Sequence, residues 1–340
     1  MQTFATGKKE LLPGTAARKI FGLIAAEMSL VEAEYERQVR SNIQVVNYLG
    51  DYLRASGGKR VRPALLILAC GACGGATSGK NVISLATVME MLHTATLVHD
   101  DIIDNADLRR NRASVNARFG NQTAVLMGDW LYMSAFETSL QERSLEILDI
   151  LTRLTRKMTE GELIQLTMIG RLDISESDYF DILKRKTAYL FSACAEIGAI
   201  LAGASLERQH ALRDYGMNLG IAFQLVDDAL DYGGKATKLG KNTGDDFREG
   251  KITLPVILAR ETGDDEERAF WRRVMGGGEA RTGDFEHALA ILRKRNAITR
   301  TIDFARVYAN AAREALKDMP DTVWRTTLTD LVDFVVDRAH

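Results

Sequence analysis

The sequence predicts an all-α fold, because hydrophobic residues recur at helical spacing and the signals for tight hairpins are missing. Val82, Leu85, Met89 and Leu92 follow one another in steps of three and four, which is the spacing of one helix face. Only four prolines occur in 340 residues, and neither Asn-Gly nor Asp-Gly is present, although these dipeptides are typical of β-hairpins. We therefore expect a helical protein without an extensive sheet.

Prolines and glycines divide the expected helices along the chain. Pro63 and Pro320 lie near helix starts, where proline is best tolerated. Helical spacing of hydrophobic residues continues through 82–104 and again through 217–231. We expect interhelical loops at the glycine-rich breaks, which are residues 57–58, 74–75, 233–234 and 276–278.

The domain organisation is expected to be simple. No linker rich in serine and proline separates two halves, and no proline occurs between Pro63 and Pro255, which favours one bundle of about ten or more helices. We expect one domain over residues 1–340, with a loosely ordered segment at 1–25. Residues 261–285 are rich in charged residues and glycine, and they are expected to form an exposed loop between helices.

The composition fits a globular protein and argues against several other classes. Hydrophobic residues make up 46% of the chain and charged residues 26%, which excludes a disordered chain and a collagen. The net charge of -2 gives no reason to expect a nucleic-acid partner. Three cysteines cannot all pair, and no export signal is visible at the N-terminus. The apolar stretches 64–73 and 194–204 are short for a bilayer, so we expect a soluble, cytoplasmic protein.

One acidic pattern, D-D-x-x-D, occurs twice inside strongly apolar helical segments. A helix brings its three carboxylates together, because residues three and four apart share a face. The two triplets are Asp100, Asp101 and Asp104, and Asp227, Asp228 and Asp231. A single acidic triplet is more often a solvated helix face. The second copy and the apolar flanks instead favour two acidic sites at the mouth of a cavity.

Such a pair of sites predicts a divalent metal and a phosphate ligand. Clustered carboxylates without nearby thiolates select a hard cation, and Mg²⁺ takes one or two carboxylates and completes its shell with water and phosphate. Two facing triplets would carry roughly six negative charges and would repel a diphosphate unless cations came between them. The metal would then act as a Lewis acid on a leaving group.

Basic segments adjoin the triplets in positions that suit an anion. The segment 57–63 has three cations and two glycines immediately before a helix, whose N-terminus favours anions. Arg109 and Arg110 follow the first triplet, and arginine makes bidentate contacts with phosphate. The segment 238–251 follows the second triplet and has the polar composition of a closing lid. Each of these segments taken alone is also typical of a charged surface loop.

With these features in this order, the sequence resembles the trans-prenyltransferases, or isoprenyl diphosphate synthases, from about Lys59 to its end. The resemblance rests on six blocks, which are GGKRVRP, LVHDDIIDNADLRRNR, GDWLY, KTAYLFSACAEIGA, GIAFQLVDDALDY and LGKNTGDDFREGKITLPV. It implies the isoprenoid synthase fold, which is a single all-α bundle around a deep central cavity, and usually a homodimer.

The resemblance also implies a reaction and its partners. The enzyme would add isopentenyl diphosphate repeatedly, head to tail, to an allylic primer such as farnesyl or geranyl diphosphate. Three Mg²⁺ per active site would be held by the six aspartates, with Asp100, Asp104 and Asp227 as the principal ligands. Release of the hydrophobic product would involve a transient contact with a membrane.

Two groups of polar residues would bind the two substrates. The allylic diphosphate would be contacted by Arg109, Lys186, Thr187, Gln224 and Lys241, with Lys251 close by. Isopentenyl diphosphate would lie in a neighbouring basic pocket of Lys59, Arg62, His93 and Arg110. The catalytic set implied by the resemblance is Asp100, Asp104, Asp227, Lys186 and Lys241.

Small residues before the first triplet predict a long product. Short-chain members of the family carry aromatic side chains where this sequence has Ala95 and Thr96, so the shaft below the metal site would stay open. The growing chain would pass Met91, and Tyr132 or Phe136 would form its floor, although plain core packing explains these aromatic residues equally well. The resemblance is to octaprenyl to decaprenyl synthases that make ubiquinone side chains, with decaprenyl slightly favoured.

Several other functions remain open from the sequence. A shorter-chain farnesyl or geranylgeranyl diphosphate synthase would share every motif. A class I terpene cyclase usually replaces the second triplet and lacks the GGKRVRP pocket, whereas a non-catalytic subunit of a heteromeric synthase commonly loses one or both triplets. A helical divalent-metal-binding protein is a further alternative. The retained motifs favour the catalytic long-chain synthase.

Overall fold

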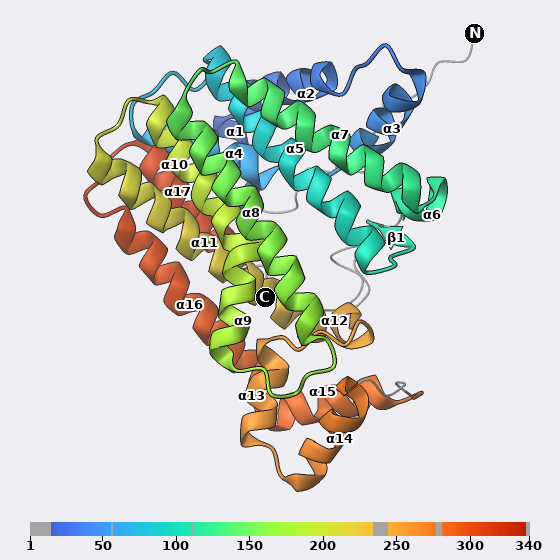
Figure 1. The fold of residues 1–340 in the computed structure, drawn as a ribbon. Helices are drawn as coiled ribbons and strands as arrows, with labels where there is room; N and C mark the ends of the chain where they lie inside the picture. The colour runs from blue at the N-terminus through green and yellow to red at the C-terminus, as the bar shows by residue number, and fades with distance from the viewer. Residues whose placement is uncertain (1–14, 56, 111, 234–243, 277–280, 338–340) are drawn as a thin grey trace.

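The fold was obtained as a computed structural model that describes residues 15–55, 57–110, 112–233, 244–276 and 281–337 (Figure 1). These residues form helices throughout, which confirms the all-α prediction. The helices are α1 (Thr15–Leu23), α2 (Ala25–Gln38), α3 (Gln44–Ala55), α4 (Val61–Ala72), α5 (Lys80–Ile103), α6 (Val115–Phe119), α7 (Asn121–Leu140), α8 (Leu145–Met168), α9 (Glu176–Leu183), the π-turn η1 (Lys184–Ala188), α10 (Tyr189–Leu201), α11 (Leu206–Gly233), α12 (Asp245–Arg248), α13 (Leu254–Thr262), α14 (Asp265–Met275), α15 (Asp284–Lys294), α16 (Ala297–Ala315) and α17 (Val323–Val336).

A short hairpin interrupts the helices after α5. Its strands, β1 (Leu108–Arg109) and β2 (Arg112–Ala113), pair antiparallel with Leu108 opposite Ala113. Local sequence does not predict this turn, because Arg110 rather than a glycine takes the left-handed conformation, with φ at 52°. The hairpin lies directly beyond the first acidic triplet and carries both arginines that follow it.

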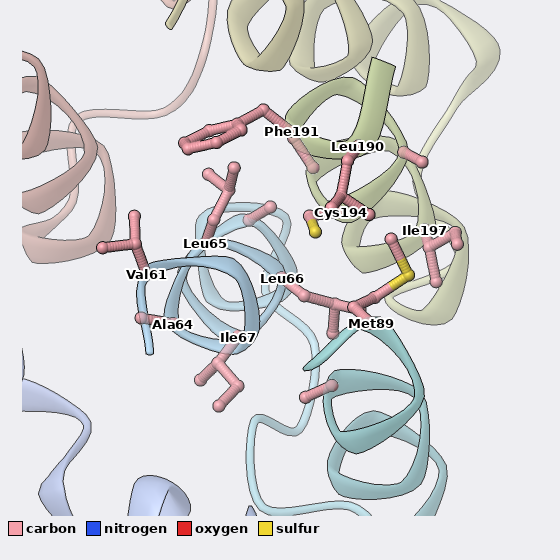
Figure 2. Close-up of a cluster of buried hydrophobic side chains, with 14 of the residues drawn as sticks. Val61, Ala64, Leu65, Leu66, Ile67, Met89, Leu190, Phe191, Cys194 and Ile197 are labelled. Atoms are coloured by element: carbon pink, nitrogen blue, oxygen red, sulfur yellow. The ribbon is translucent and has the colours of Figure 1, made fainter. Parts of the chain in front are cut away.

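The centre of the molecule is built from α4, α5, α10 and α11. Every residue of α4 except Arg62 is buried, and α4 packs between α5 and α10 (Figure 2). Leu66 of α4 lies near Met89 of α5 and near Cys194 and Ile197 of α10, and all four side chains have almost no exposed surface. Burial on all sides explains why α4 and α10 have apolar residues around their whole circumference.

Helix α5 is long and apolar enough to cross a membrane by length and composition alone. Its most apolar window is 72% buried inside the structure, as expected of a core helix. This helix is separate from the two shorter apolar stretches identified in the sequence, 64–73 and 194–204, which fall largely in α4 and α10. Its length carries the chain from the core to the first acidic triplet.

The helix α11 joins two hydrophobic clusters. Its first half, including Leu212 and Leu219, packs in the cluster with α4, α5 and α10. Its second half, including Leu225 and Val226, packs in the cluster that contains α13 to α16. Tyr308 of α16 contacts both clusters.

Two expectations about loops need correction. Residues 15–25 are not loosely ordered: they form α1 and the start of α2, since Ile20 and Ile24 pack in the core without exposed surface, whereas 1–14 lie outside the described residues. The segment 261–285 contains α14, whose start is fixed by a capping box between Asp264 and Glu267. Trp271 of α14 is completely buried, so this strongly charged stretch has an apolar inner face.

Close approach of helix backbones depends on glycine at the α10–α11 crossing. A Cβ atom at Gly216 would lie 2.5 Å from the carbonyl oxygen of Phe191. We expect Gly216→Ala to lower the free energy of unfolding by roughly 1–3 kcal/mol, the usual cost of overpacking. Denaturant unfolding would measure the change. Gly22→Ala is the matched control, because nothing lies within 4 Å of a Cβ at this helical glycine, and it should not destabilise the protein.

Candidate active site

Both acidic triplets lie at the C-terminal ends of long helices. Asp100 and Asp101 are in the last turn of α5, and Asp104 follows its last residue. Asp227, Asp228 and Asp231 occupy the last two turns of α11. The C-terminus of a helix carries partial negative charge, so the helix dipole does not stabilise these carboxylates. Both sites therefore favour bound cations.

The first triplet is partly paired with basic side chains. Arg109 Nε donates to Asp101 Oδ1 at 2.6 Å, and Lys251 Nζ donates to Asp104 Oδ2 at 3.0 Å. Loss of hydration raises the pKa of Asp100 to about 7, and the carboxylate of Glu162 adds to this rise more than Lys186 opposes it. Asp100 is thus the acid of this triplet whose negative charge is least compensated.

The second triplet is held by hydrogen bonds from three directions. Asp228 accepts hydrogen bonds from the Tyr179 hydroxyl and from Gln224 Nε2. Burial raises the pKa of Asp228 to about 6 despite these two bonds, and the other aspartates of the triplet contribute to the rise. Asp231 accepts from the backbone N–H groups of 244, 245 and 246 at 3.1 to 3.2 Å.

The segment 244–251 connects the two triplets. Its N–H groups donate to Asp231 on α11, and its last residue, Lys251, pairs with Asp104 beyond α5. The Lys251 N–H also donates to the Asp246 carbonyl at 2.9 Å, which closes the turn after α12. Asp104 and Lys251 are 147 residues apart in the chain. The acidic ends of α5 and α11 are therefore brought to the same short segment.

The donor set suits magnesium. All six acidic side chains offer oxygen atoms, which hard divalent cations prefer. Among the described residues, no three acidic, histidine or cysteine side chains are arranged as ligands of one ion. A cation here would bind one or two carboxylates and would need further oxygen ligands, as Mg²⁺ takes from water and phosphate.

The expected contacts of the allylic diphosphate gather near α8 and α11. Lys186 lies in the π-turn η1 and donates to Glu162 and to Gln165 Oε1, the latter at 2.7 Å. The Thr187 hydroxyl donates to Gln224 Oε1 at 2.8 Å, and Gln224 in turn binds Asp228. A π-turn widens the helix locally and is frequent at functional sites. Lys241 lies outside the described residues.

Sequence reasoning missed three polar groups of this region: Tyr179, Glu162 and Gln165. Each approaches the acidic sites from a helix, α8 or α9, that has no acidic motif of its own. A single sequence gives no signal for such partners, since Tyr179 and Asp228 are 49 residues apart.

Of the four residues expected to bind isopentenyl diphosphate, Arg110 lines a second cleft, whereas Lys59, Arg62 and His93 are not among its lining residues. Arg110 and Arg109 line this cleft together with Arg60, Glu90 and Thr94. Arg110 donates to the carbonyl of Gly57, and a Cβ on Gly58 would lie 2.8 Å from Arg110 Nη1. The Arg110 guanidinium therefore packs directly against the 57–58 backbone.

Arg62 is close enough to His93 for its charge to affect the imidazole, and Lys59 lies in the loop before α4. The Arg62 guanidinium stacks on the Phe191 ring at 5.2 Å, and its Nε is a buried donor without a partner among the described residues. Burial lowers the pKa of His93 well below its ordinary value, and Arg62 lowers it further. His93 is therefore a neutral hydrogen-bonding group between cations.

The residues proposed to control chain length are divided between two environments. Tyr132 and Phe136 line a groove of about 600 Å³ between α7 and α8. The Tyr132 ring stacks on the His99 ring, with 5.9 Å between the ring centroids. Burial raises the pKa of Tyr132, and the charge of Asp100 adds to this rise. The groove therefore begins beside the first triplet. Met91 and Ala95 are fully buried in the core and do not line this groove.

Thr96 is partly exposed and lies one turn before Asp100. Its hydroxyl donates to the His93 carbonyl at 2.8 Å. Residues four apart share a helix face, so Thr96 is the nearer of the two small residues to the side of α5 that carries Asp100.

Comparison with known proteins agrees with this arrangement. Residues 43–292 match the polyprenyl synthetase family model. Octaprenyl diphosphate synthase of Escherichia coli K12 is 40% identical over 320 residues, covering 94% of this chain and 98% of that protein.

Solved structures agree as well. A polyprenyl synthase from Caulobacter crescentus CB15, complexed with calcium and isoprenyl diphosphate, superposes with a TM-score of 0.91 at 40% identity, over 96% of this chain and 99% of that one. A decaprenyl diphosphate synthase from Rhodobacter capsulatus gives 0.90 at 40% identity, over 95% and 99%. The resemblance drawn from the motifs is thereby confirmed, and this chain belongs to the polyprenyl synthetase family as a prenyltransferase.

Proposed function

We propose that the chain is a long-chain trans-polyprenyl diphosphate synthase that adds isopentenyl diphosphate, head to tail, to farnesyl or geranyl diphosphate. The observation that carries this proposal is the convergence of both aspartate triplets on the segment 244–251. Two acidic sites beside one another can hold a diphosphate only with divalent cations between them. Three Mg²⁺ per active site would supply Lewis-acid stabilisation to the departing diphosphate.

In this proposal the basic residues bind and orient the diphosphates. Arg109, Lys186 and Lys251 now pair with carboxylates, and they would turn to the allylic diphosphate when it binds, as Lys241 would. Thr187 and Gln224 would hold the same group by neutral hydrogen bonds. The negative charge that develops on the leaving diphosphate would be stabilised by cations that are already in place. Such electrostatic stabilisation is the main contribution to the rate enhancement in a site of this kind.

The second substrate would lie in the cleft beside the hairpin. Lys59, Arg62, His93 and Arg110 would bind the diphosphate of isopentenyl diphosphate and direct its double bond toward the allylic carbon. Neutral His93 would donate a hydrogen bond without adding charge. The apolar walls of α4, α5 and α10 would keep water from the allylic cation. The cation formed by condensation would then lose a proton to the departed diphosphate, which restores a double bond.

The product is proposed to range from octaprenyl to decaprenyl diphosphate for a ubiquinone side chain. Relatives named as octaprenyl and decaprenyl synthases support this range, as do the small residues Ala95 and Thr96. We further propose that residues 1–340 act as one domain, since α11 joins both hydrophobic clusters. A cytoplasmic homodimer that touches a membrane during product release completes the proposal.

A single incubation tests this function. Purified protein, farnesyl diphosphate, isopentenyl diphosphate and Mg²⁺ should yield a polyprenyl diphosphate in the octaprenyl to decaprenyl range by chromatography, and chelation of the metal should abolish it. A cyclised hydrocarbon formed without isopentenyl diphosphate would indicate a terpene cyclase. Metal binding without turnover would indicate a non-catalytic subunit, and a farnesyl or geranylgeranyl product would overturn the long-chain assignment.

A further inference from the structure

Arg60 stands in the middle of the basic run 59–62, but its guanidinium is already engaged inside the protein. Its Nη1 donates to Glu90 Oε1 at 2.6 Å and its Nε donates to Glu32 Oε1 at 2.8 Å. The guanidinium also stacks on the Tyr35 ring at 5.2 Å. Arg60 is therefore occupied by contacts within the protein, with two carboxylates and one aromatic ring around its guanidinium.

The backbone of Arg60 is held in an unfavourable conformation. Its φ is 49°, in the left-handed region that residues with a side chain rarely adopt. Arg60 immediately precedes the first residue of α4, so this conformation sets the path of the chain between Lys59 and Arg62. A strained backbone conformation of this kind persists only where surrounding contacts hold the residue in it. The ion pairs of Arg60 are the contacts in position to do so.

Glu90 is the buried member of this cluster. Its side chain is 7% exposed, against 31% for Glu32, which shares the same guanidinium. It lies on α5 one turn before His93 and Thr94, and the Thr94 hydroxyl donates to its backbone carbonyl. Burial lowers the pKa of both Arg62 and Arg110, and the Glu90 carboxylate opposes that fall in each. The buried Glu90 carboxylate thus interacts with three arginines, Arg60, Arg62 and Arg110, of which Arg60 and Arg110 line the second cleft.

We propose that Glu90 is a positioning residue for the isopentenyl diphosphate pocket, which acts by holding Arg60 so that the 57–60 loop and the first turn of α4 present Lys59 and Arg62 to the diphosphate. The inference rests on the proposed function, because it assigns that cleft to isopentenyl diphosphate. It predicts an effect on one substrate and not on the other. The carboxylates that pair with the Arg60 guanidinium are Glu32 and Glu90, which belong to neither aspartate triplet, so binding of the allylic primer should be unaffected.

Steady-state kinetics of Glu90→Gln test the proposal. We expect KM for isopentenyl diphosphate to rise about tenfold, the effect of misplacing one charge-assisted contact, while KM for the allylic primer stays within about twofold. Glu90→Asp, which keeps the charge, should recover part of the loss. Glu32→Gln is the matched control, since it removes the more exposed partner of the same guanidinium and should change the KM less.

A double variant separates positioning from general damage. If Glu90 acts through Arg60, the combined Arg60→Gln and Glu90→Gln protein should have a KM for isopentenyl diphosphate no worse than the poorer single variant. Removing both charges also avoids leaving an unpaired buried group, so this protein keeps the test available if Glu90→Gln folds poorly. Additive losses, or a parallel rise of both KM values, would overturn the inference.

The same assays distinguish failure of the inference from failure of the proposed function. If the unaltered protein consumes no isopentenyl diphosphate, the proposed function is wrong. If the unaltered protein is active and Glu90→Gln leaves its KM for isopentenyl diphosphate unchanged, only the role of Glu90 is wrong.

Discussion

Replacing Asp100 or Asp227 by alanine is expected to lower turnover of isopentenyl diphosphate about a thousandfold, which corresponds to roughly 4 kcal/mol of transition-state stabilisation. Each substitution removes one carboxylate that is proposed to hold the cations on the leaving diphosphate. Asp100 carries the least compensated charge of its triplet, since burial and Glu162 raise its pKa to about 7. Its loss should therefore weaken cation binding without weakening the fold.

The measurement is incorporation of isopentenyl diphosphate at saturating Mg²⁺, together with the helical circular dichroism signal and the melting temperature. Asp265→Asn is the control, because Asp265 is fully exposed on α14, far from both triplets in the chain. It should keep normal turnover. Near-normal turnover in both alanine variants would show that the metal assignment is wrong, whereas loss of the helical signal would show that these carboxylates support the fold.

The features that the sequence could predict are those that depend on residues within a single helix. The two triplets were visible because three carboxylates fall within five residues and stand out in apolar segments. The fold class was visible for the same reason, since helical periodicity is a local property. Local patterns therefore located the acidic ends of α5 and α11 without any structure.

The partners of those carboxylates were invisible because they depend on tertiary packing. Tyr179 approaches Asp228 from α9, and Glu90 meets Arg60 from α5, across 30 residues of chain. Neither partner belongs to a spacing pattern. The motifs therefore identified the residues that are expected to contact substrate. The side chains that hold those residues in place were identified only from the packing of α5, α8 and α9.

Two errors had a common physical cause. Helix α14 was taken for a loop because its apolar inner face is short and its other residues are mostly charged, although Phe270 and Trp271 are buried. The β1–β2 hairpin was missed because Arg110 adopts a conformation usually left to glycine or asparagine. In both places, tertiary contacts overrode the local preference on which the prediction depended.

Placing a phenyl ring at position 96 is expected to shorten the product to geranylgeranyl diphosphate or less. Thr96 precedes Asp100 by four residues, an advance of about 6 Å along the helix, and its side chain is partly exposed. A ring there would stand close beside the bound primer and stop the chain early. Ala95→Phe, the other expected plug, would insert the ring into packed core at a cost of roughly 1–3 kcal/mol, so its effect on length would be mixed with instability.

The opposite change lies further along the groove between α7 and α8. Phe136 lines that groove beyond Tyr132, and Phe136→Ala should give a longer or broader set of products if its ring is the floor. Reversed-phase chromatography of the dephosphorylated products would measure both variants. Val307→Phe adds the same ring at an exposed position of α16 and should leave the product unchanged. If Thr96→Phe leaves the length of the product unchanged, the growing chain passes the first triplet by another route. The groove beside Tyr132 would then not be the site of chain elongation.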